Sequence, residues 1–284
     1  MGCLWASQFP EQQCHFLVKA GHGFLQQSHF CVQPSGQTIH FHASRPQDYH
    51  SQGDCIVIAT KAYDALPALR SALQAVTNPR AVFLLQNGMG SQQEIADHYP
   101  DLALFAVSST HGAYKADINT LVHAGVGIQR IGALNPQANA TLLNNLMPAC
   151  LYQWHTDIQN VLWQKLQINA AINALTVIYQ CANGALLDGA GREQHMAGLC
   201  AETDHLLDAL GIPHQPSLQL ARQVTSSTAN NYSSMYQDVK QQRRTEIDFI
   251  NGYIVRTAQQ QGLICPLHED ILQQAKTWPF IPVE

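Results

Sequence analysis

A change of hydrophobic period near residue 156 constrains the fold of this chain more than any other feature of its sequence. Before that point, short apolar runs alternate with amphipathic segments, as in β-α-β units. We predict strands at residues 14–19, 54–60, 81–86 and 102–109, with helices at residues 64–76 and 91–98. Three shorter runs, 38–42, 119–123 and 128–131, predict additional antiparallel strands. The first part therefore predicts an α/β domain, with helices on both faces of a parallel sheet.

Beyond residue 156 the strand signals stop and only the helical period remains. We predict helices at residues 157–179, 193–209, 216–225, 234–261 and 268–277. Gly211 with Pro213, and Gly262 with Pro266, mark helix ends, because Gly adopts the left-handed cap conformation and Pro cannot continue a helix. We therefore predict two domains, residues 1–156 and residues 157–284, of which the second is all-helical.

The composition argues against several classes of protein. Hydrophobic residues make up 46% of the chain and charged residues 12%, which indicates a globular protein. The formal net charge is -5 and there is no run of Lys and Arg, so we expect no nucleic-acid partner. We find neither an apolar stretch of about 18 residues nor a basic segment followed by an apolar one, and we expect no membrane span and no signal peptide.

The eight cysteines and fourteen histidines predict neither disulfides nor a metal site. The cysteines form no C-x-x-C pair, and most lie in apolar segments, as Cys55 does. We therefore expect reduced, buried thiols and a cytoplasmic protein. His40 and His42 alternate on one face of a predicted strand, but no Cys, Asp or Glu stands at ligand spacing beside them. We expect no bound metal.

Three polar residues, Lys165, Asn169 and Asn173, recur at four-residue intervals in an otherwise apolar helix. Each four-residue step turns about 40° around a helix, so the three side chains form one narrow polar stripe. Burying such a stripe costs stability unless other polar groups meet it. One interpretation is a structural hydrogen-bond network between helices. The other is a ligand-facing surface, with an ammonium for a carbonyl oxygen and two amides for hydroxyl and carboxylate groups.

A second polar segment, residues 230–238, predicts the start of a helix. Ser234 and Gln237 fit the capping box, so we expect free backbone N–H groups and the positive end of a helix dipole there. Such an end suits a small carboxylate, although an ordinary helix cap explains the same residues. Farther along the predicted helix, Glu246 and Asp248 lie on different faces, so at most one of these acids can face the same ligand as Ser234.

These segments together resemble the ketopantoate reductase family, the 2-dehydropantoate 2-reductases, over nearly the whole chain. The most specific matches are W-x-K-L-x-x-N-x-x-I-N at residues 163–173, and S-S-M-x-Q-D followed by T-E-I-D-x-I-N-G at residues 233–252. Residues 59–62 and 85–90 match more weakly. The resemblance implies a Rossmann-like first domain and an oxidoreductase. Its reaction would be the NADPH-dependent reduction of 2-dehydropantoate to (R)-pantoate, for pantothenate and coenzyme A synthesis.

The resemblance also implies roles for individual residues. Lys165 would donate the proton to the 2-oxo oxygen, which agrees with the need for a cation at a developing alkoxide. The implied substrate-binding residues are Asn87, Asn169, Asn173, Asn183, Asn231, Ser233 and Ser234. The implied cofactor-binding residues are Gly2, Lys61, Asn87, Ala113 and Glu246. Lys19 joins them because it ends a predicted strand, where NADP enzymes tend to place a cation; a surface lysine is the other explanation.

The chain departs from the family at its start. Enzymes of this kind open with a strand and G-x-G-x-x-G, whose glycines allow a tight turn and bring pyrophosphate to a helix N-terminus. Here only the last glycine, Gly2, and the helix after it match. The absent first strand would lie centrally in the sheet. We therefore expect the natural product to be longer, with Met1 an internal methionine, and keep a degraded form as the alternative.

Two other functions stay open at this point. The same fold and chemistry could serve another 2-oxo acid. The chain could also be an inactive, truncated paralogue that binds ligand without catalysis. In each case we expect a small-molecule ligand and a monomer or homodimer.

Overall fold

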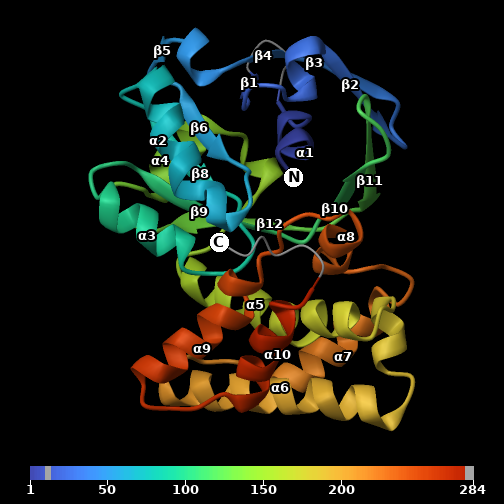
Figure 1. The fold of residues 1–284 in the computed structure, drawn as a ribbon. Helices are drawn as coiled ribbons and strands as arrows, with labels where there is room; N and C mark the ends of the chain where they lie inside the picture. Colours follow the sequence, from blue (N-terminus) through green and yellow to red (C-terminus); the bar gives the residue numbers. More distant parts are fainter. Residues whose placement is uncertain (10–13, 279–284) are drawn as a thin grey trace. The chain divides into compact units, whose positions relative to one another are not determined.

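The structure is a computed structural model that describes residues 1–9 and 14–278. The chain forms two compact units, and Figure 1 traces it through both. The sheet unit comprises Met1–Gln86 and Ser91–Ile158, and the helical unit comprises Asn87–Gly90 and Gln159–Glu284. The segment Asn87–Gly90 thus belongs to the helical unit by its contacts, although residues of the sheet unit precede and follow it in sequence.

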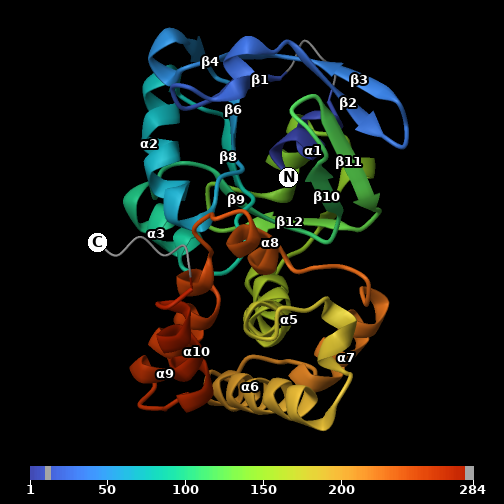
Figure 2. The ribbon, with the colours of Figure 1, turned by 45° about the vertical axis from the view of Figure 1, so that its right-hand side comes forward.

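A five-stranded sheet forms the centre of the sheet unit (Figure 2). Its strands, in spatial order, are β13 (Gln153–Trp154), β12 (Gln129–Ala133), β9 (Leu104–Ser109), β8 (Ala81–Leu84) and β6 (Cys55–Ile58). β6, β8 and β9 run parallel, whereas β12 is antiparallel to β9. Every residue of β8 is buried, as in a central strand that is covered on both faces. The predicted strands at 54–60, 81–86, 102–109 and 128–131 are confirmed, with shifted ends.

Helices cover both faces of this sheet, as predicted. They are α1 (Gly2–Ala6), α2 (Ala65–Ala75), α3 (Ser91–His98) and α4 (Ala140–Leu146). Leu69 of α2 and Ile95 of α3 belong to one core cluster, and Trp5 of α1 and Leu143 of α4 belong to another. Alternate residues of β8 enter the two clusters because successive side chains of a strand point to opposite faces. The indole Nε1 of Trp5 also donates a hydrogen bond to Gln129 on β12.

Smaller elements complete the sheet unit. A four-stranded sheet has the order β10 (Gly112–Lys115), β11 (Thr120–Gly125), β2 (His29–Gln33) and β3 (Gln37–His40). Two-stranded sheets join β1 (His15–Leu17) to β4 (His42–Ser44), and β5 (Ser51–Gln52) to β7 (Val76–Thr77). The 3-10 helices are η2 (Gly23–Gln26), η3 (Pro46–Asp48), η4 (Ala62–Asp64) and η5 (Ala149–Leu151).

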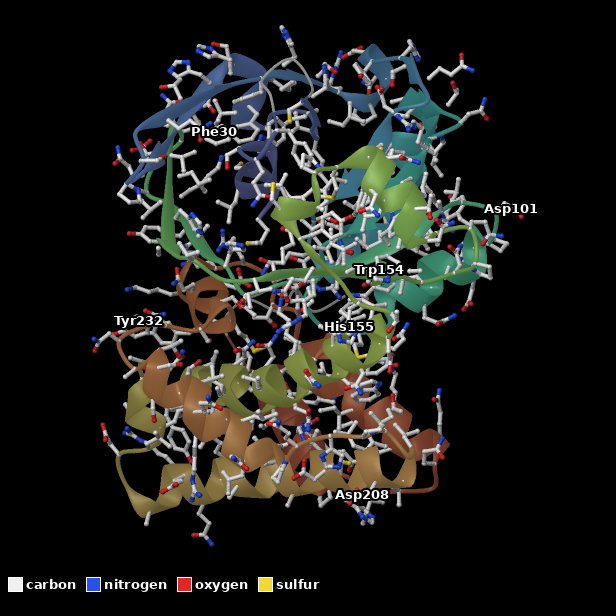
Figure 3. The ribbon with its side chains drawn as sticks, turned by 180° about the vertical axis from the view of Figure 1, so that it is seen from behind. Phe30, Asp101, Trp154, His155, Asp208 and Tyr232 are labelled. Atoms are coloured by element: carbon white, nitrogen blue, oxygen red, sulfur yellow. The ribbon has the colours of Figure 1, made fainter. Side chains whose placement is uncertain are left out.

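The prediction of one antiparallel strand at 38–42 is wrong. Phe41 leaves the ladder and enters a core cluster with Phe24 and Phe30, the last of which Figure 3 labels. It thereby separates β3, antiparallel to β2, from β4, which is parallel to β1. The predicted strand at 119–123 corresponds to β11, which is antiparallel to β10 but parallel to β2. A mixed sheet of this kind cannot be inferred from apolar runs alone.

β1 and β6 are among the edge strands of the sheet unit, which have an unpaired side. Within the described residues, β1 pairs with β4 alone and β6 pairs with β8 alone. On β6, Ile56 and Ile58 are buried, whereas Cys55 and Val57 are exposed, so one face of this strand is covered. The prediction that Cys55 is buried is therefore wrong. All eight thiols are free, as predicted, but only Cys200 and Cys265 are buried.

The helical unit consists of helices joined by short loops. They are α5 (Ile158–Ile178), η6 (Asn183–Leu186), α6 (Ala190–Ala209), α7 (Ser217–Ser227), α8 (Ser234–Lys240), η7 (Ile247–Phe249), α9 (Asn251–Gln260) and α10 (Pro266–Ala275). Gly211 and Gly262 have φ angles of 64° and 71°, which confirms the predicted left-handed helix ends. No helix in the described part of the chain is long and apolar enough to cross a membrane.

The prediction of one helix at 234–261 is wrong, because the chain breaks between α8 and α9. Gln242 adopts a left-handed φ of 59°, and Arg243 donates its backbone N–H to Asp238 O. The buried carboxylate of Asp238 also pairs with the guanidinium of Arg243 at 3.0 Å. The polar run from Gln241 to Arg244 offers no apolar face that would hold a continuous helix on the core. The break lets the chain turn back before Glu246.

Candidate active site

Lys165 is the centre of the candidate site, on the long helix α5. The polar stripe predicted from the sequence exists, because α5 carries Lys165, Asn169 and Asn173 without interruption. Burial lowers the pKa of the Lys165 ammonium to about 8, and the nearby carboxylate of Glu246 opposes this shift. Glu246 is 5% exposed, whereas the side chain of Asp248 is 57% exposed. One of the two acids is thus buried beside the lysine and the other is solvated, as the sequence suggested.

The start of α8 lies against the end of the stripe. Ser233 is the N-cap residue, and its Oγ accepts a hydrogen bond from the backbone N–H of Tyr236. The predicted cap at Ser234 is therefore displaced by one residue, and Ser234 opens the helix itself. Ser233 Oγ also lies 2.6 Å from Thr176 Oγ1, and Thr176 donates to Asn173 O at 2.7 Å. Because either serine offers the same hydroxyl, the sequence could not decide between them.

Asn183 contributes a buried acceptor in η6. Thr228 uses its hydroxyl proton on Val224 O, so the Asn183 atom that faces Thr228 Oγ1 at 2.8 Å must be the donor Nδ2. This orientation leaves Asn183 Oδ1 buried and without a hydrogen-bond partner in the described part of the chain. The backbone N–H of Asn183 donates to Asn231 O at 2.9 Å. Asn183 and Asn231, far apart in sequence, are therefore neighbours, and the free Oδ1 can accept from a ligand hydroxyl.

Asn87 belongs to the same unit as Lys165. The segment that it opens is held by Met89, whose backbone N–H donates to Phe249 O at 2.8 Å. Gly88 has a φ of 77°, and a Cβ at this position would come within 2.4 Å of Phe249 O. Only glycine therefore allows the segment to approach η7 so closely. The sequence identified Asn87 as a site residue but gave no sign that it belongs with the helices.

The sheet unit holds the other residues that are expected to bind a cofactor. Lys19 and Lys61 follow β1 and β6 at their carboxyl ends, where open α/β sheets bind ligands. Lys19 is 79% exposed and pairs with Asp64 at 3.2 Å. Ala113 lies on β10, opposite His123.

Gly2 meets the requirement for close packing between helix and strand. It opens α1, and a Cβ on it would come within 3.0 Å of Ala59 Cβ. This is the role of the third glycine in a dinucleotide-binding fingerprint. Together with the lysines after β1 and β6, it makes the residues present suitable for holding part of a nicotinamide dinucleotide. The first two glycines of that fingerprint are absent from this sequence.

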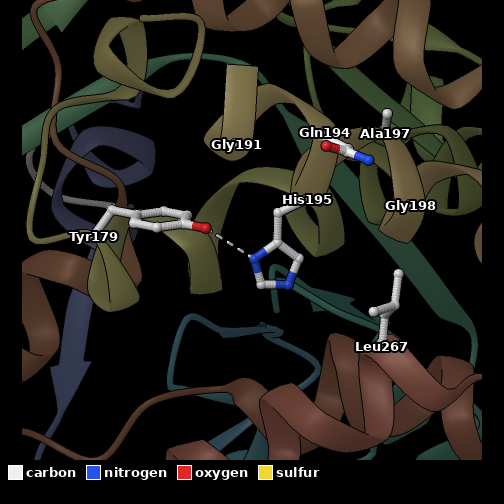
Figure 4. Close-up of a pocket in the computed structure, with 7 residues that line it drawn as sticks. All are labelled: Tyr179, Gly191, Gln194, His195, Ala197, Gly198 and Leu267. Carbon is white, nitrogen blue, oxygen red and sulfur yellow. Dashed lines mark hydrogen bonds between the residues drawn. The ribbon is translucent and has the colours of Figure 1, made fainter. Parts of the chain in front are cut away.

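The helical unit also has a pocket, a hollow of about 620 Å³, which none of the expected site residues lines (Figure 4). Tyr179 points its hydroxyl at His195 Nδ1, at 3.1 Å. Gly191 and Gly198 lie on the same helix, α6, as His195, and Leu267 of α10 completes the lining. The hollow is thus separate from the polar stripe of α5.

The fold and these residues define a two-part oxidoreductase, with lysines after parallel strands in one unit and an ammonium among amides in the other. The chain belongs to the ketopantoate reductase family. The model of "Ketopantoate reductase PanE/ApbA" matches residues 1–136, and that of "Ketopantoate reductase PanE/ApbA C terminal" matches residues 157–278. The 2-dehydropantoate 2-reductase of Vibrio cholerae serotype O1 is 34% identical over 239 residues, which cover 79% of this chain and 77% of that protein.

Two solved structures have a similar fold. A PanE/ApbA family ketopantoate reductase from Ralstonia eutropha JMP134 superposes with a TM-score of 0.82 at 24% identity, covering 97% of this chain and 92% of the other. A ternary structure of D-mandelate dehydrogenase with NADH and anilino(oxo)acetate gives a TM-score of 0.79 at 20% identity, covering 89% and 86%. At these identities the likeness concerns the fold.

Proposed function

We propose that this chain catalyses the NADPH-dependent reduction of 2-dehydropantoate to (R)-pantoate. The observation that carries the proposal is the Lys165 ammonium, which lies on the polar stripe of α5 with a pKa of about 8. The relative from Vibrio cholerae is named after this activity, as a 2-dehydropantoate 2-reductase. A lysine with this pKa is mostly protonated at neutral pH, yet it can release its proton more readily than an ordinary lysine. This is the property that a proton donor to a carbonyl oxygen requires.

In the proposed reaction, the C=O bond at C2 of the substrate becomes a C–O single bond. NADPH, when bound, would supply the hydride. Lys165 Nζ stabilises the negative charge that develops on the 2-oxo oxygen and then gives it a proton. Lys165 is left as a neutral amine and regains a proton from solvent. Glu246 favours the ammonium form and so prepares the residue for the next turnover.

The amides and hydroxyls of the helical unit would bind the rest of the substrate. Asn169 and Asn173 continue the stripe that begins at Lys165 and can donate and accept hydrogen bonds. Asn183 Oδ1 is a buried acceptor that suits a hydroxyl of the substrate. Asn231 and the first turn of α8, with Ser234, would meet the carboxylate and a hydroxyl.

We further propose that residues 1–156 form the cofactor domain and residues 157–284 the substrate domain. Gly2, Lys19, Lys61 and Ala113 would hold the dinucleotide. Asn87 would lie between nicotinamide and substrate, and Glu246 would contact the cofactor from the helical side.

The test is a measurement of NADPH consumption with 2-dehydropantoate, for the 284-residue chain and for a form extended upstream in its reading frame. We expect turnover with this substrate, and slower turnover with branched 2-oxo acids that lack its 4-hydroxyl. Inactivity of both forms would contradict the proposal. A clear preference for an acid without the 4-hydroxyl would assign the same chemistry to another substrate.

A further inference from the structure

Thr176 joins the two ends of the proposed substrate site through a chain of hydroxyl groups. It lies on α5, three residues after Asn173, and is 0% exposed. Its Oγ1 lies 2.7 Å from Asn173 O and 2.6 Å from Ser233 Oγ, and the latter lies 3.0 Å from Tyr236 N. Neither the polar stripe nor the family resemblance assigns any role to Thr176.

The positions of the protons in this chain follow from the distances. Thr176 has one hydroxyl proton, and two oxygens 2.7 Å apart repel unless a proton lies between them. Thr176 therefore donates to Asn173 O, and the Ser233 hydroxyl must donate to Thr176. The alternative, in which Ser233 donates to Asn173 O, would use a contact of 3.5 Å and leave the shorter one without a proton. The chain thus runs from the Tyr236 N–H through Ser233 and Thr176 to the carbonyl of Asn173.

This assignment restricts what Ser233 can do. Its only proton is committed to Thr176, so Ser233 cannot donate to a substrate carboxylate. Ser234 is exposed. Of the two serines, only Ser234 can therefore donate its hydroxyl proton to a ligand. The hydrogen-bond chain through Ser233 and Thr176, which we call the relay, therefore joins the first turn of α8 to the stripe of α5. Recognition of the substrate carboxylate is left to Ser234.

We propose that Thr176 is a positioning residue, which acts through Ser233 to fix the first turn of α8 relative to Asn173. This inference rests on the proposed function, because it concerns the binding of the same substrate. A second anchor holds the loop before α8, where Asn183 donates to Asn231 O. Loss of the Thr176 hydroxyl would leave that anchor intact and hold the helix start only through the longer contact of 3.5 Å between Ser233 Oγ and Asn173 O. The substrate would then bind less tightly while the proton donor stays in place.

Thr225 provides a matched control. It is also 0% exposed and helical, in α7, but its Oγ1 has no hydrogen-bond partner within residues 1–9 and 14–278. Thr225→Val removes a buried hydroxyl of the same kind without touching the relay. In Thr176→Val the Ser233 hydroxyl can donate to Asn173 O instead, so every buried donor keeps an acceptor. This variant should therefore fold. Thr176→Ser keeps the hydroxyl and loses only a methyl group.

The experiment measures KM and kcat for 2-dehydropantoate, together with pantoate affinity by calorimetry. For Thr176→Val we expect KM to rise about tenfold and pantoate to bind about tenfold more weakly, the effect of losing one buried hydrogen bond. The KM for NADPH should not change, Thr176→Ser should restore the KM for 2-dehydropantoate, and Thr225→Val should resemble the wild type. An unchanged KM and pantoate affinity in a folded Thr176→Val variant would overturn the proposal.

A double-mutant cycle tests whether Thr176 acts through Ser233. Ser233→Ala should raise KM by a similar factor, and the variant with both changes should be no worse than Ser233→Ala alone. Fully multiplicative effects would show that the two hydroxyls act independently, and would overturn the relay. Inactivity of the unmodified enzyme would instead contradict the proposed function, and the positioning role with it.

Discussion

A buried polar cluster of the helical unit and a proposed cofactor residue of the sheet unit are held in opposite ways. In the helical unit, His268 is fully buried, with contacts to Asn251 at 3.0 Å and to Thr203 at 3.1 Å, and Asn251 also donates to the α5 carbonyl of Ala170. In the sheet unit, Lys19 projects into solvent and pairs only weakly with Asp64. Substrate recognition would therefore depend on an ordered interior, and cofactor recognition on residues at strand ends. Substitutions in the two units should differ accordingly in what they disturb.

The largest expected effect is the loss of turnover in Lys165→Ala. Without the ammonium, neither charge stabilisation nor a proton is available at the 2-oxo oxygen, and we expect kcat to fall by about 1000-fold or more. Circular dichroism should show an unchanged helical signal. Lys240→Ala, which removes an exposed lysine at the end of α8, should keep normal turnover. Turnover near the wild-type rate in Lys165→Ala would remove this residue from the mechanism.

Gly88→Ala should show how strongly the four-residue segment depends on the helical unit. The new Cβ would lie 2.4 Å from Phe249 O, at a φ of 77° that disfavours alanine. We expect the free energy of unfolding to fall by roughly 2–4 kcal/mol, with a loss of activity from displaced Asn87. Gly191→Ala on α6, where no atom lies within 4 Å of the added Cβ, should be neutral or slightly stabilising. Equal stability of the two variants in denaturant titrations would contradict this account.

The pH dependence of the reaction should report Lys165 directly. Reduction needs the ammonium, so its rate should be constant below the pKa of about 8 and fall as the pH rises through it. Oxidation of pantoate needs the neutral amine and should show the opposite trend. In Glu246→Gln the opposing charge is lost, so the Lys165 pKa falls and the decline of the reduction rate moves to lower pH. The rates are to be measured at saturating NADPH. The same pH profile in the wild type and in Glu246→Gln would exclude an effect of Glu246 on the pKa of Lys165.

The smallest expected effect is that of Lys19→Ala in the sheet unit. Its ion pair is exposed, so the free energy of unfolding should change by less than about 1 kcal/mol. If Lys19 contacts a 2′-phosphate, the KM for NADPH should rise a few-fold and that for NADH should not. Asp64→Asn breaks the same ion pair but keeps the cation, and should leave both KM values unchanged. Identical behaviour of the two variants would indicate that Lys19 serves only the ion pair.

The sequence predicted best those features that lie within one regular element. Lys165, Asn169 and Asn173 could be placed on one face of a helix because the helical period fixes their spacing. The end at Gly211 followed in the same way from the conformational freedom of glycine. The strand β8 was recognisable because a strand that is buried on both faces needs a continuous apolar run.

Of the remaining features, one depends on a local backbone conformation and two depend on contacts between distant segments. The break after α8 requires Gln242 in a left-handed conformation, which its side chain does not reveal. No sequence pattern marks Thr176, because its partner Ser233 lies 57 residues away. The unpaired Oδ1 of Asn183 likewise depends on the orientation that Thr228 imposes. The physical cause of the last two features is hydrogen bonding between distant segments, which produces no periodic pattern in the sequence.

The membership of Asn87–Gly90 in the helical unit has a consequence for genetic exchange within the family. The chain passes between the two units at three peptide bonds, after Gln86, Gly90 and Ile158. A chimera recombined only after Ile158 would pair the 87–90 segment of one parent with the Phe249 carbonyl of another. The codons for residues 87–90 would therefore have to come from the same parent as those for residues 159–284, so that a well-matched chimera has three junctions and not one.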